Sequence, residues 1–198
     1  KDFYFGEIIK SCKKQSGIFL VQINWSKNKS YEILNFISNN KSENNRLIIG
    51  KSMDFKYEIK LYFNKLKTFF YLINKSKKNT KLKKNYLFHS KNIFSSSSVQ
   101  ANRIAISIEN IIKQVNPKRV MITLEGHSWE RLSFYVAKKF NSEIQCIGYL
   151  HAGIFKHQHS LMRLFKYHYN PDLILTCGKS SYMDLKENFK NSKISVEN

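Results

Sequence analysis

The apolar positions in the second half of the chain follow two alternating patterns. Continuous apolar runs predict strands over residues 119–124, 144–149 and 172–176. Between these runs, apolar residues three or four positions apart predict helices over 99–115, 129–140 and 180–189, and 161–169 is a further helix candidate. Strands that alternate with helices of this length predict βαβ units. The expected fold class is therefore α/β, a Rossmann-like parallel sheet covered by helices.

The first half of the chain shows the same alternation less regularly. Residues 17–23 and 46–49 predict strands, and residues 31–38 predict a short helix. We expect one domain, with residues 1–94 as its N-terminal α/β portion and residues 95–198 as its Rossmann-like portion. The chain begins with Lys1 rather than Met and ends just after a strand-like run at 194–196. We therefore expect a fragment of a longer protein, truncated at its C-terminus.

Residues 53–74 have a basic amphipathic pattern that predicts a helix. Its apolar residues recur at spacings of three and four and are Phe55, Ile59, Tyr62, Phe63, Leu66, Phe69, Phe70 and Ile73. The opposite stripe consists of Lys56, Lys60, Asn64 and Lys67, and six lysines follow in a predicted basic loop at 75–84. Two interpretations stay open. The helix either packs its apolar face on the core or lies in an anionic membrane interface.

The net charge of +20 is concentrated around this predicted helix. Between residues 51 and 91, twelve lysines stand against Asp54 and Glu58, and no acidic residue lies between residues 59 and 108. Such a block indicates an anionic partner, which is a phospholipid, a nucleic acid or a phosphate-bearing substrate. The abundance of lysine and asparagine also fits an AT-rich genome. No apolar run reaches the roughly 20 residues of a membrane-spanning helix.

The cysteines and the apolar content bound the class of protein. An apolar fraction of 42% is enough for a packed core. Three cysteines without a CxxC pair argue against a disulfide framework and fit a reducing cytosol. Cys146 and Cys177 fall in predicted strands, where cysteine acts as a small apolar residue.

Three loops are candidates for a site. In an open parallel sheet, ligands bind beyond the carboxyl ends of the strands. This rule selects residues 125–128, 150–153 and 178–181, which we expect to open on one edge of the sheet. Five of the six histidines lie between His127 and His168, the segment that holds the first two loops.

The first loop is the most crowded with polar residues. Gly126 allows a tight turn at the end of the strand, and Ser128 and Glu130 suit the start of a helix. Glu125 and His127 then remain as candidates for a general base and the group that orients it. The alternative is a solvated carboxylate beside a hydrogen-bonded histidine.

The remaining candidates are more isolated. His151 lies between an apolar strand and a turn of small residues, a position typical of a site residue. His157 and His159 have H-x-H spacing, but two ligands without a nearby carboxylate or cysteine do not predict a metal site. Lys179 opens a helix whose first amides could hold a phosphate, unless the loop is a plain helix cap. Trp129 is either a packing residue or a stacking platform for a sugar or base.

Three segments resemble a known group of proteins. They are LEGHSWERL at 124–132, IGYLHAGIF at 147–155 and PDLILTCGKSSYMDL at 171–185. Together they resemble bacterial surface-carbohydrate biosynthesis proteins, which are glycosyltransferases of capsule or lipopolysaccharide assembly with a GT-B-like fold. The match covers roughly residues 117–189. Leu150 departs from the pattern, because the group has Gln before the histidine.

The resemblance implies two Rossmann-like domains that face a cleft, with a nucleotide sugar held mainly by the C-terminal domain. This chain would be the acceptor-side domain, and the nucleotide-binding half would be missing. The nucleotide sugar is then a substrate, and neither a metal nor another cofactor is expected. The resemblance also implies a peripheral location on the cytoplasmic side of the inner membrane. There the basic helix and the lysine loop would hold the enzyme near a glycan or lipid-linked acceptor.

The resemblance further implies roles for individual residues. Glu125 would deprotonate the acceptor hydroxyl, and His127 or His151 would orient it or contact the donor phosphate. Arg131 and Arg103 are candidates for binding a phosphate or an acidic sugar. The full set of substrate-binding candidates is Arg131, Trp129, Arg103, Gly126, Gly153 and Lys179.

Two other functions remain open. A nucleic-acid-binding module rests on charge alone, because the chain lacks an arginine-rich or aromatic-interleaved binding signature, and we expect no nucleic-acid partner. The other is a non-catalytic domain that scaffolds polysaccharide assembly. Convergence of Glu125, His127 and His151 in one cleft would favour the enzyme, whereas side chains that point apart would favour the scaffold.

Overall fold

The fold is that of a computed structural model, which describes residues 19–23, 45–50, 53–154, 158–190 and 192–197. The chain divides into two compact units, Lys1–Met53 and Asp54–Asn198. In the first unit, β1 (Phe19–Ile23) pairs in parallel with β2 (Asn45–Ile49), and Phe19 lies opposite Asn45. Both strands were predicted from their apolar runs. The predicted helix at 31–38 lies outside the described residues.

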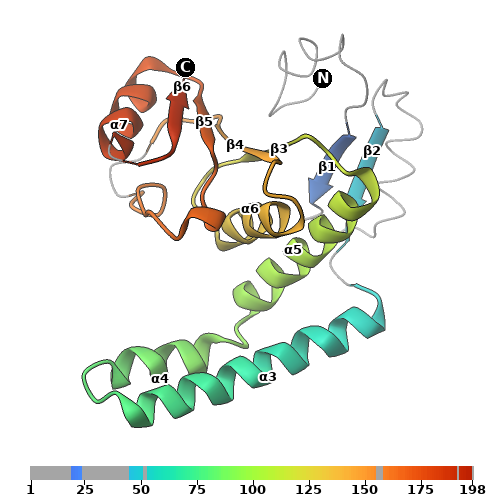
Figure 1. The fold of residues 1–198 in the computed structure, drawn as a ribbon, viewed down its shortest axis with the longest axis vertical. Coiled ribbons are helices and arrows are strands. Elements are labelled where there is room, and N and C mark those ends of the chain that lie inside the picture. The colour runs from blue at the N-terminus through green and yellow to red at the C-terminus, as the bar shows by residue number, and fades with distance from the viewer. Residues whose placement is uncertain (1–18, 24–44, 51–52, 155–157, 191, 198) are drawn as a thin grey trace. The chain divides into compact units, whose positions relative to one another are not determined.

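The second unit contains a four-stranded parallel sheet in the order β3-β4-β5-β6 (Figure 1). Its strands are β3 (Arg119–Thr123), β4 (Gln145–Leu150), β5 (Leu173–Thr176) and β6 (Ser195–Glu197). The helix α6 (Ser128–Phe140) connects β3 to β4 and packs against both, and α7 (Lys179–Phe189) connects β5 to β6 in the same way. The predicted α/β class with a parallel sheet is confirmed.

The predicted helix at 161–169 is wrong. Only the 3₁₀ helix η1 (Tyr167–Tyr169) forms there. The carbonyl groups of Leu161 and Arg163 accept hydrogen bonds from the Arg131 guanidinium, both at 3.4 Å. The Asn170 side chain bonds the N–H of Phe165 at 3.2 Å and its carbonyl at 2.8 Å. Because side chains take up these backbone groups, the segment runs as an irregular loop between β4 and η1.

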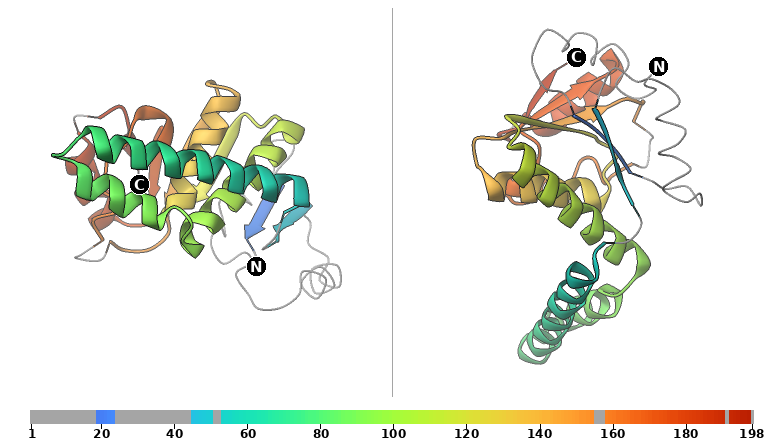
Figure 2. Two further views of the ribbon diagram at one scale, coloured as in Figure 1. Left: turned by 90° about the horizontal axis from the view of Figure 1, so that it is seen from below. Right: turned by 90° about the vertical axis from the view of Figure 1, so that its right-hand side faces the viewer.

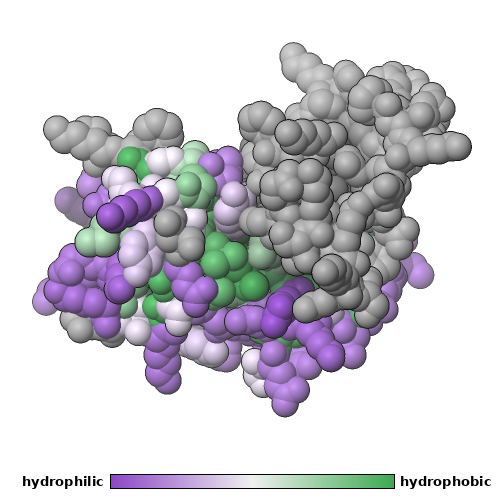
Figure 3. Space-filling view, turned by 90° about the horizontal axis from the view of Figure 1, so that it is seen from above, coloured by the Kyte–Doolittle hydropathy of each residue, from purple (hydrophilic) through white to green (hydrophobic). Residues whose placement is uncertain are grey.

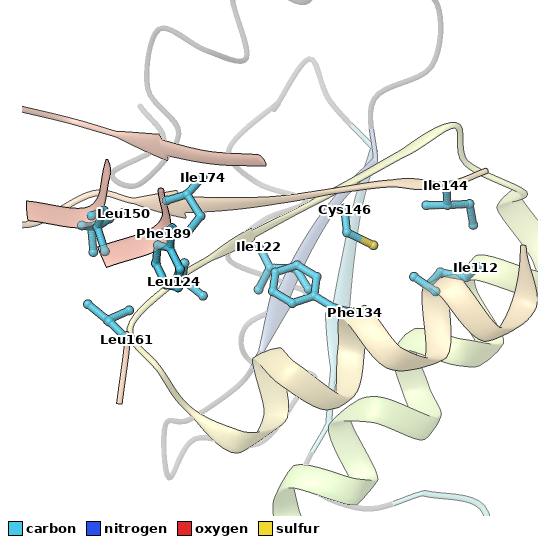
Figure 4. Packing of buried hydrophobic residues seen from close by; sticks show 12 residues of the cluster. Ile112, Ile122, Leu124, Phe134, Ile144, Cys146, Leu150, Leu161, Ile174 and Phe189 are labelled. Carbon is cyan, nitrogen blue, oxygen red and sulfur yellow. The ribbon is translucent and has the colours of Figure 1, made fainter. Parts of the chain in front are cut away.

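The core of the second unit lies between the sheet and its helices (Figure 4). It contains Ile112, Ile122, Leu124, Phe134, Ala137, Ile144, Cys146, Leu150, Leu161, Ile174, Leu185 and Phe189. Ile112 belongs to α5 (Ser96–Val115), which packs against α6. Gly148 in β4 lies under Leu124, because a Cβ at Gly148 would stand 2.8 Å from Leu124 Cδ2. The apolar runs that predicted the strands contribute five of these residues, Ile122, Leu124, Ile144, Cys146 and Ile174, and the helices, the end of β4 and the loop after it contribute the others.

The two described cysteines differ. Cys146 is fully buried in β4, and burial raises the pKa of its thiol to about 12, so it acts as a small apolar residue. Cys177, expected inside a strand, instead follows the last residue of β5 and is exposed. β5 ends at Thr176, which is also the last residue of the predicted strand.

The basic amphipathic segment forms a helical hairpin. α3 (Phe55–Lys78) begins at Asp54, whose side chain accepts the Lys56 N–H at 3.3 Å. It continues to Lys78, four residues into the predicted basic loop at 75–84, and only residues 79–82 separate it from α4 (Lys83–Asn92). The two helices lie side by side in both views (Figure 1 and Figure 2). Among the helices of the described ranges, none is both long and apolar enough to cross a membrane.

The interpretation in which α3 packs its apolar stripe on the core is wrong. Phe55, Phe63 and Phe70 from that stripe are 76%, 56% and 60% exposed. The residues of α3 that are buried are Leu61, Lys65 and Ser76, on a different side of the helix from these three phenylalanines. Figure 3 shows another face of the molecule, on which hydrophilic described residues surround a smaller group of hydrophobic ones. Most of the apolar stripe is thus exposed on α3, and large apolar residues elsewhere, such as Phe88 and Leu164, are exposed as well.

A buried ion pair joins α6 to the start of β5. The side chain of Lys138 is 1% exposed, and its Nζ donates to Asp172 Oδ1 at 2.6 Å and to the Asn170 carbonyl at 2.9 Å. The second oxygen of Asp172 accepts the Cys146 N–H of β4 at 2.8 Å. One carboxylate therefore fixes α6, β4 and the entry to β5 together.

We expect Asp172→Ala to lower the free energy of unfolding by about 3–5 kcal/mol, because it leaves the Lys138 ammonium buried without its charge partner. Glu109→Ala is the control, since it removes the partner of the exposed Lys113 and should change stability by less than about 1 kcal/mol. Urea unfolding of both variants measures the difference. Equal effects of the two substitutions would contradict the role given to Asp172.

Candidate functional site

The turn between β3 and α6 is built on a buried carboxylate. Glu130 has no exposed surface, and its Oε2 accepts the N–H groups of Gly126 at 2.8 Å and His127 at 3.0 Å. Its Oε1 accepts the N–H of Glu125 at 3.0 Å. His127 occupies the N-cap position of α6 and Ser128 is the first helical residue, so the expectation that Ser128 caps this helix is wrong. Glu130 lies three residues after the cap, where it can reach back to the turn.

Two opposing effects act on the Glu130 carboxyl group. Burial, the larger effect, raises its pKa to about 7 from 4.5. The backbone N–H groups of the turn and the nearby His127 favour the ionised form and limit that rise. The group therefore changes its charge near neutral pH while it holds the turn.

Gly126 is required by the geometry of the same turn. Its φ is +90°, a conformation that residues with a side chain rarely adopt. A Cβ at this position would stand 2.3 Å from Ser160 Oγ and 2.9 Å from the Ser160 backbone carbon. Ser160 also donates to the Glu125 carbonyl at 3.4 Å, and Gln158 donates to that carbonyl at 3.1 Å. The loop after β4 therefore packs directly on the turn after β3.

The structure brings Glu125, His127 and His151 together. Glu125 Oε2 lies 3.1 Å from His127 Nε2, and Glu125 Oε1 lies 3.5 Å from His151 Nε2. His151 follows the last residue of β4 and Glu125 lies two residues after β3, so the contact joins the carboxyl ends of neighbouring strands. Each oxygen of the carboxylate thus faces one imidazole. The three candidate side chains thus lie together at the carboxyl edge of the sheet.

The three side chains differ in exposure. The His127 side chain is 57% exposed, that of Glu125 43%, and that of His151 18%. Because an ionised carboxylate can only accept hydrogen bonds, an imidazole that bonds it must carry hydrogen on Nε2. A ligand from solvent can reach Glu125 and His127, whereas the more buried His151 holds the inner oxygen of the carboxylate.

The other candidates do not join this group. Trp129 is partly buried and packs against the core, which agrees with its interpretation as a packing residue. Arg103 forms an ion pair with Glu58, with Nε 2.8 Å from Oε1, and so links α5 to α3. Gly153 is exposed in the loop after β4, and Lys179 is exposed as the first residue of α7, so both follow the carboxyl ends of strands. Their substrate-binding roles stay predictions.

Arg131 faces the interior of the protein. It is 6% exposed, donates to the Asn170 side chain at 3.2 Å, and lies 5.4 Å from the Phe165 ring centroid. A pocket of about 370 Å³ opens beside it, lined by Gly126, Ser128, Arg131, Leu132, Ser160, Arg163, Phe165 and Tyr169. The guanidinium primarily holds the loop after β4 in place. Its expected contact with a phosphate or acidic sugar stays a prediction.

Metal ligation has no support in the described part of the chain. Within those residues, no group of three or more His, Cys, Asp or Glu side chains is arranged to hold a metal ion. His159 is exposed, and His157 lies outside the described residues.

Comparison with family models, with curated proteins and with solved structures gives no match to this chain. The site must therefore be interpreted from its own geometry.

Sequence reasoning missed the role of Glu130. It placed this residue at the helix start for its favourable interaction with the positive end of the helix. The signal that would have found the role is a polar cap residue followed three positions later by glutamate, since this spacing lets the carboxylate bond the N–H groups before the helix. The contacts of Gln158 and Ser160 with the turn had no such signal, because they come from a loop more than 30 residues away.

We expect Gly126→Ala to lower the free energy of unfolding by about 2–4 kcal/mol, because it combines an unfavourable φ with a clash against the Ser160 backbone. Gly153→Ala is the matched control, since a Cβ there meets nothing within 4 Å and should change stability by less than about 0.5 kcal/mol. Thermal or urea unfolding compares the two. A Gly126→Ala variant as stable as Gly153→Ala would disprove the packing of Ser160 on this turn.

Glu130 also predicts a pH dependence of stability. The unfolded chain releases this proton near pH 4.5 and the folded chain only near pH 7. Between these values the folded state binds more protons, so the free energy of unfolding falls as the pH rises. We expect Glu130→Gln to flatten this part of the curve, measured by urea unfolding at several pH values. Glu143→Gln, at an exposed position, should keep the slope, and equal slopes in both variants would contradict the assignment.

Proposed function

We propose that this chain is the acceptor-side domain of a GT-B-like glycosyltransferase. It transfers a sugar from a nucleotide-activated donor to a surface-polysaccharide or lipid-linked acceptor. The observation that carries the proposal is Glu125 between the imidazoles of His127 and His151, beyond the carboxyl ends of two parallel strands. The resemblance of three segments to surface-carbohydrate biosynthesis proteins supports the same class.

Glu125 acts as the general base in this proposal. Its carboxylate accepts the proton of an acceptor hydroxyl while that oxygen bonds to the anomeric carbon of the donor sugar. The bond between the anomeric carbon and the donor phosphate oxygen breaks, and the nucleotide leaves with the bonding electrons. Configuration at the anomeric carbon is inverted, and the proton on Glu125 then passes to solvent.

The two histidines have different tasks in the proposal. Each Nε2 holds one oxygen of Glu125, and each oxygen keeps a further lone pair for the acceptor hydroxyl. His151 is the more buried of the two and fixes the orientation of the carboxylate. The more exposed His127 contacts the acceptor or the donor phosphate. A scaffold would not require these three side chains to meet, which is why the enzyme is the better account.

The test is nucleotide release by the full-length protein from a panel of UDP-, GDP-, dTDP- and CMP-sugars, supplied with a cell-envelope glycan and lipid extract. We expect Glu125→Gln to lower the rate by about 100-fold or more, because a general base contributes about 10²–10⁴. His151→Ala should lower it by a smaller factor. Glu143→Gln, an exposed change on the amino side of β4, should keep the rate.

The thermal midpoint of Glu125→Gln must stay close to that of the unchanged protein, so that a lost rate reports chemistry rather than unfolding. Full activity of Glu125→Gln would reject its role as the base. Absence of nucleotide release from all four donor classes would reject the glycosyltransferase itself.

A further inference from the structure

The exposed side of α3 is a continuous apolar stripe. Apart from one adjacent pair, its residues follow one another at spacings of three or four positions, so they share one face of the helix. They are Phe55, Ile59, Tyr62, Phe63, Leu66 and Phe70, and all six are exposed. At 24 residues the helix is about 36 Å long. The stripe is therefore a long, narrow apolar surface that no described residue covers.

Lysines border this stripe. Lys56, Lys60 and Lys67 follow one another along the helix beside it, and Lys67 Nζ lies 4.6 Å from the Phe63 ring centroid. On the far end, Lys75 Nζ lies 5.5 Å from the Tyr71 ring centroid. The hairpin from Phe55 to Phe94 carries eleven lysines against one acidic residue, Glu58. That carboxylate is paired with Arg103 and does not offset the lysines.

A different side of α3 packs against α5 and the segment just before α5. Lys65 is 5% exposed, and its Nζ donates to the Ile93 carbonyl at 2.7 Å and to Ser98 Oγ at 2.8 Å. The Glu58–Arg103 pair ties the same side to α5. These contacts set the rotation of α3 about its axis. The packed side of α3 thus combines Leu61 with these polar residues, and the apolar stripe is left exposed.

We propose that the α3–α4 hairpin docks the protein on an anionic membrane surface. The stripe inserts its aromatic and aliphatic side chains between lipid headgroups, and the bordering lysines pair with the phosphates of anionic lipids. The helix lies in the plane of the interface rather than crossing it. This docking does not depend on the reaction catalysed at Glu125, so the two proposals stand or fall separately.

Charge argues against other occupants of the stripe. A second copy of this chain would bring its own lysine rows against those of the first, and the two hairpins would repel each other. A nucleic acid would match the charge of the lysines. It would not interact favourably with Ile59 and Leu66, which offer neither hydrogen bonds to phosphates nor rings for base stacking. An anionic lipid surface matches both the charge and the apolar stripe.

The test is co-sedimentation of the full-length protein with phosphatidylcholine vesicles, with and without phosphatidylglycerol. We expect strong binding only to the anionic vesicles, and weaker binding as salt rises. The double variant Phe63→Ser with Phe70→Ser should bind about tenfold or more weakly, because it removes two inserted rings. Lys60→Gln with Lys67→Gln should weaken binding by about tenfold or more as well, since each lysine near such a surface contributes about fivefold.

Matched controls separate this surface from the rest of the protein. Met183→Ser changes an exposed apolar residue on α7, and Lys118→Gln with Lys193→Gln removes two exposed lysines outside the hairpin. Both controls should bind vesicles within about twofold of the unchanged protein. Equal loss in controls and hairpin variants would overturn the proposal, because general charge would then explain binding.

Three further results would also overturn the docking proposal. The first is no binding to anionic vesicles. The second is oligonucleotide binding that depends on Phe63 and Phe70 while vesicle binding does not. The third is a dimer in sedimentation equilibrium that the Phe63→Ser, Phe70→Ser variant converts to a monomer, because a second copy would then cover the stripe.

Discussion

The candidate site depends on the buried carboxylate of Glu130. The N–H groups of Glu125, Gly126 and His127 precede the first full turn of α6, so the helix itself offers them no acceptor. The carboxylate in turn has lost its water and requires donors. Each half of this arrangement would be unfavourable without the other. The turn therefore has one conformation, and that conformation directs the side chains of Glu125 and His127 to the carboxyl edge of the sheet.

The helix α6 organises more than this turn, because it carries three buried ionisable side chains. Glu130 bonds the turn after β3, Arg131 bonds the loop after β4, and Lys138 bonds the entry to β5. The turn after β3 and the connection from β4 to β5 are thus tied to one helix through charged groups. Buried charges with satisfied partners contribute little net stability, but removal of one partner leaves the other uncompensated. Their effect is to define the path of loops that have few apolar contacts of their own.

The helix α3 shows the reverse distribution. Its buried side contains Lys65 and Glu58 beside Leu61, whereas Phe55, Phe63 and Phe70 face outward. An amphipathic helix in a globular protein normally buries its apolar face, because that removes the most apolar surface from water. Here Lys65 and Glu58 bond to α5 and to the segment before it, and the apolar stripe stays exposed. The exposed stripe is thereby a stronger indication of an external partner than the charge of the chain alone.

The sequence by itself determined the α/β class, the order of the strands in the second unit and the edge of the sheet where the candidate site lies, but it placed a basic loop where α4 begins. These follow from local periodicity and from the common direction of parallel strands. The tertiary structure alone decided that His127 rather than Ser128 caps α6, that Arg131 points inward, that residues 161–166 are not helical, and which side of α3 is buried. Except for the start of α6, which depends on the local contact between Glu130 and the His127 N–H, these outcomes depend on contacts between residues about 30 or more positions apart, such as Arg131 with Leu161 and Lys65 with Ser98. Periodicity shows that a helix has two faces, but the partners that compete for each face belong to distant segments, and their contacts decide which face is buried.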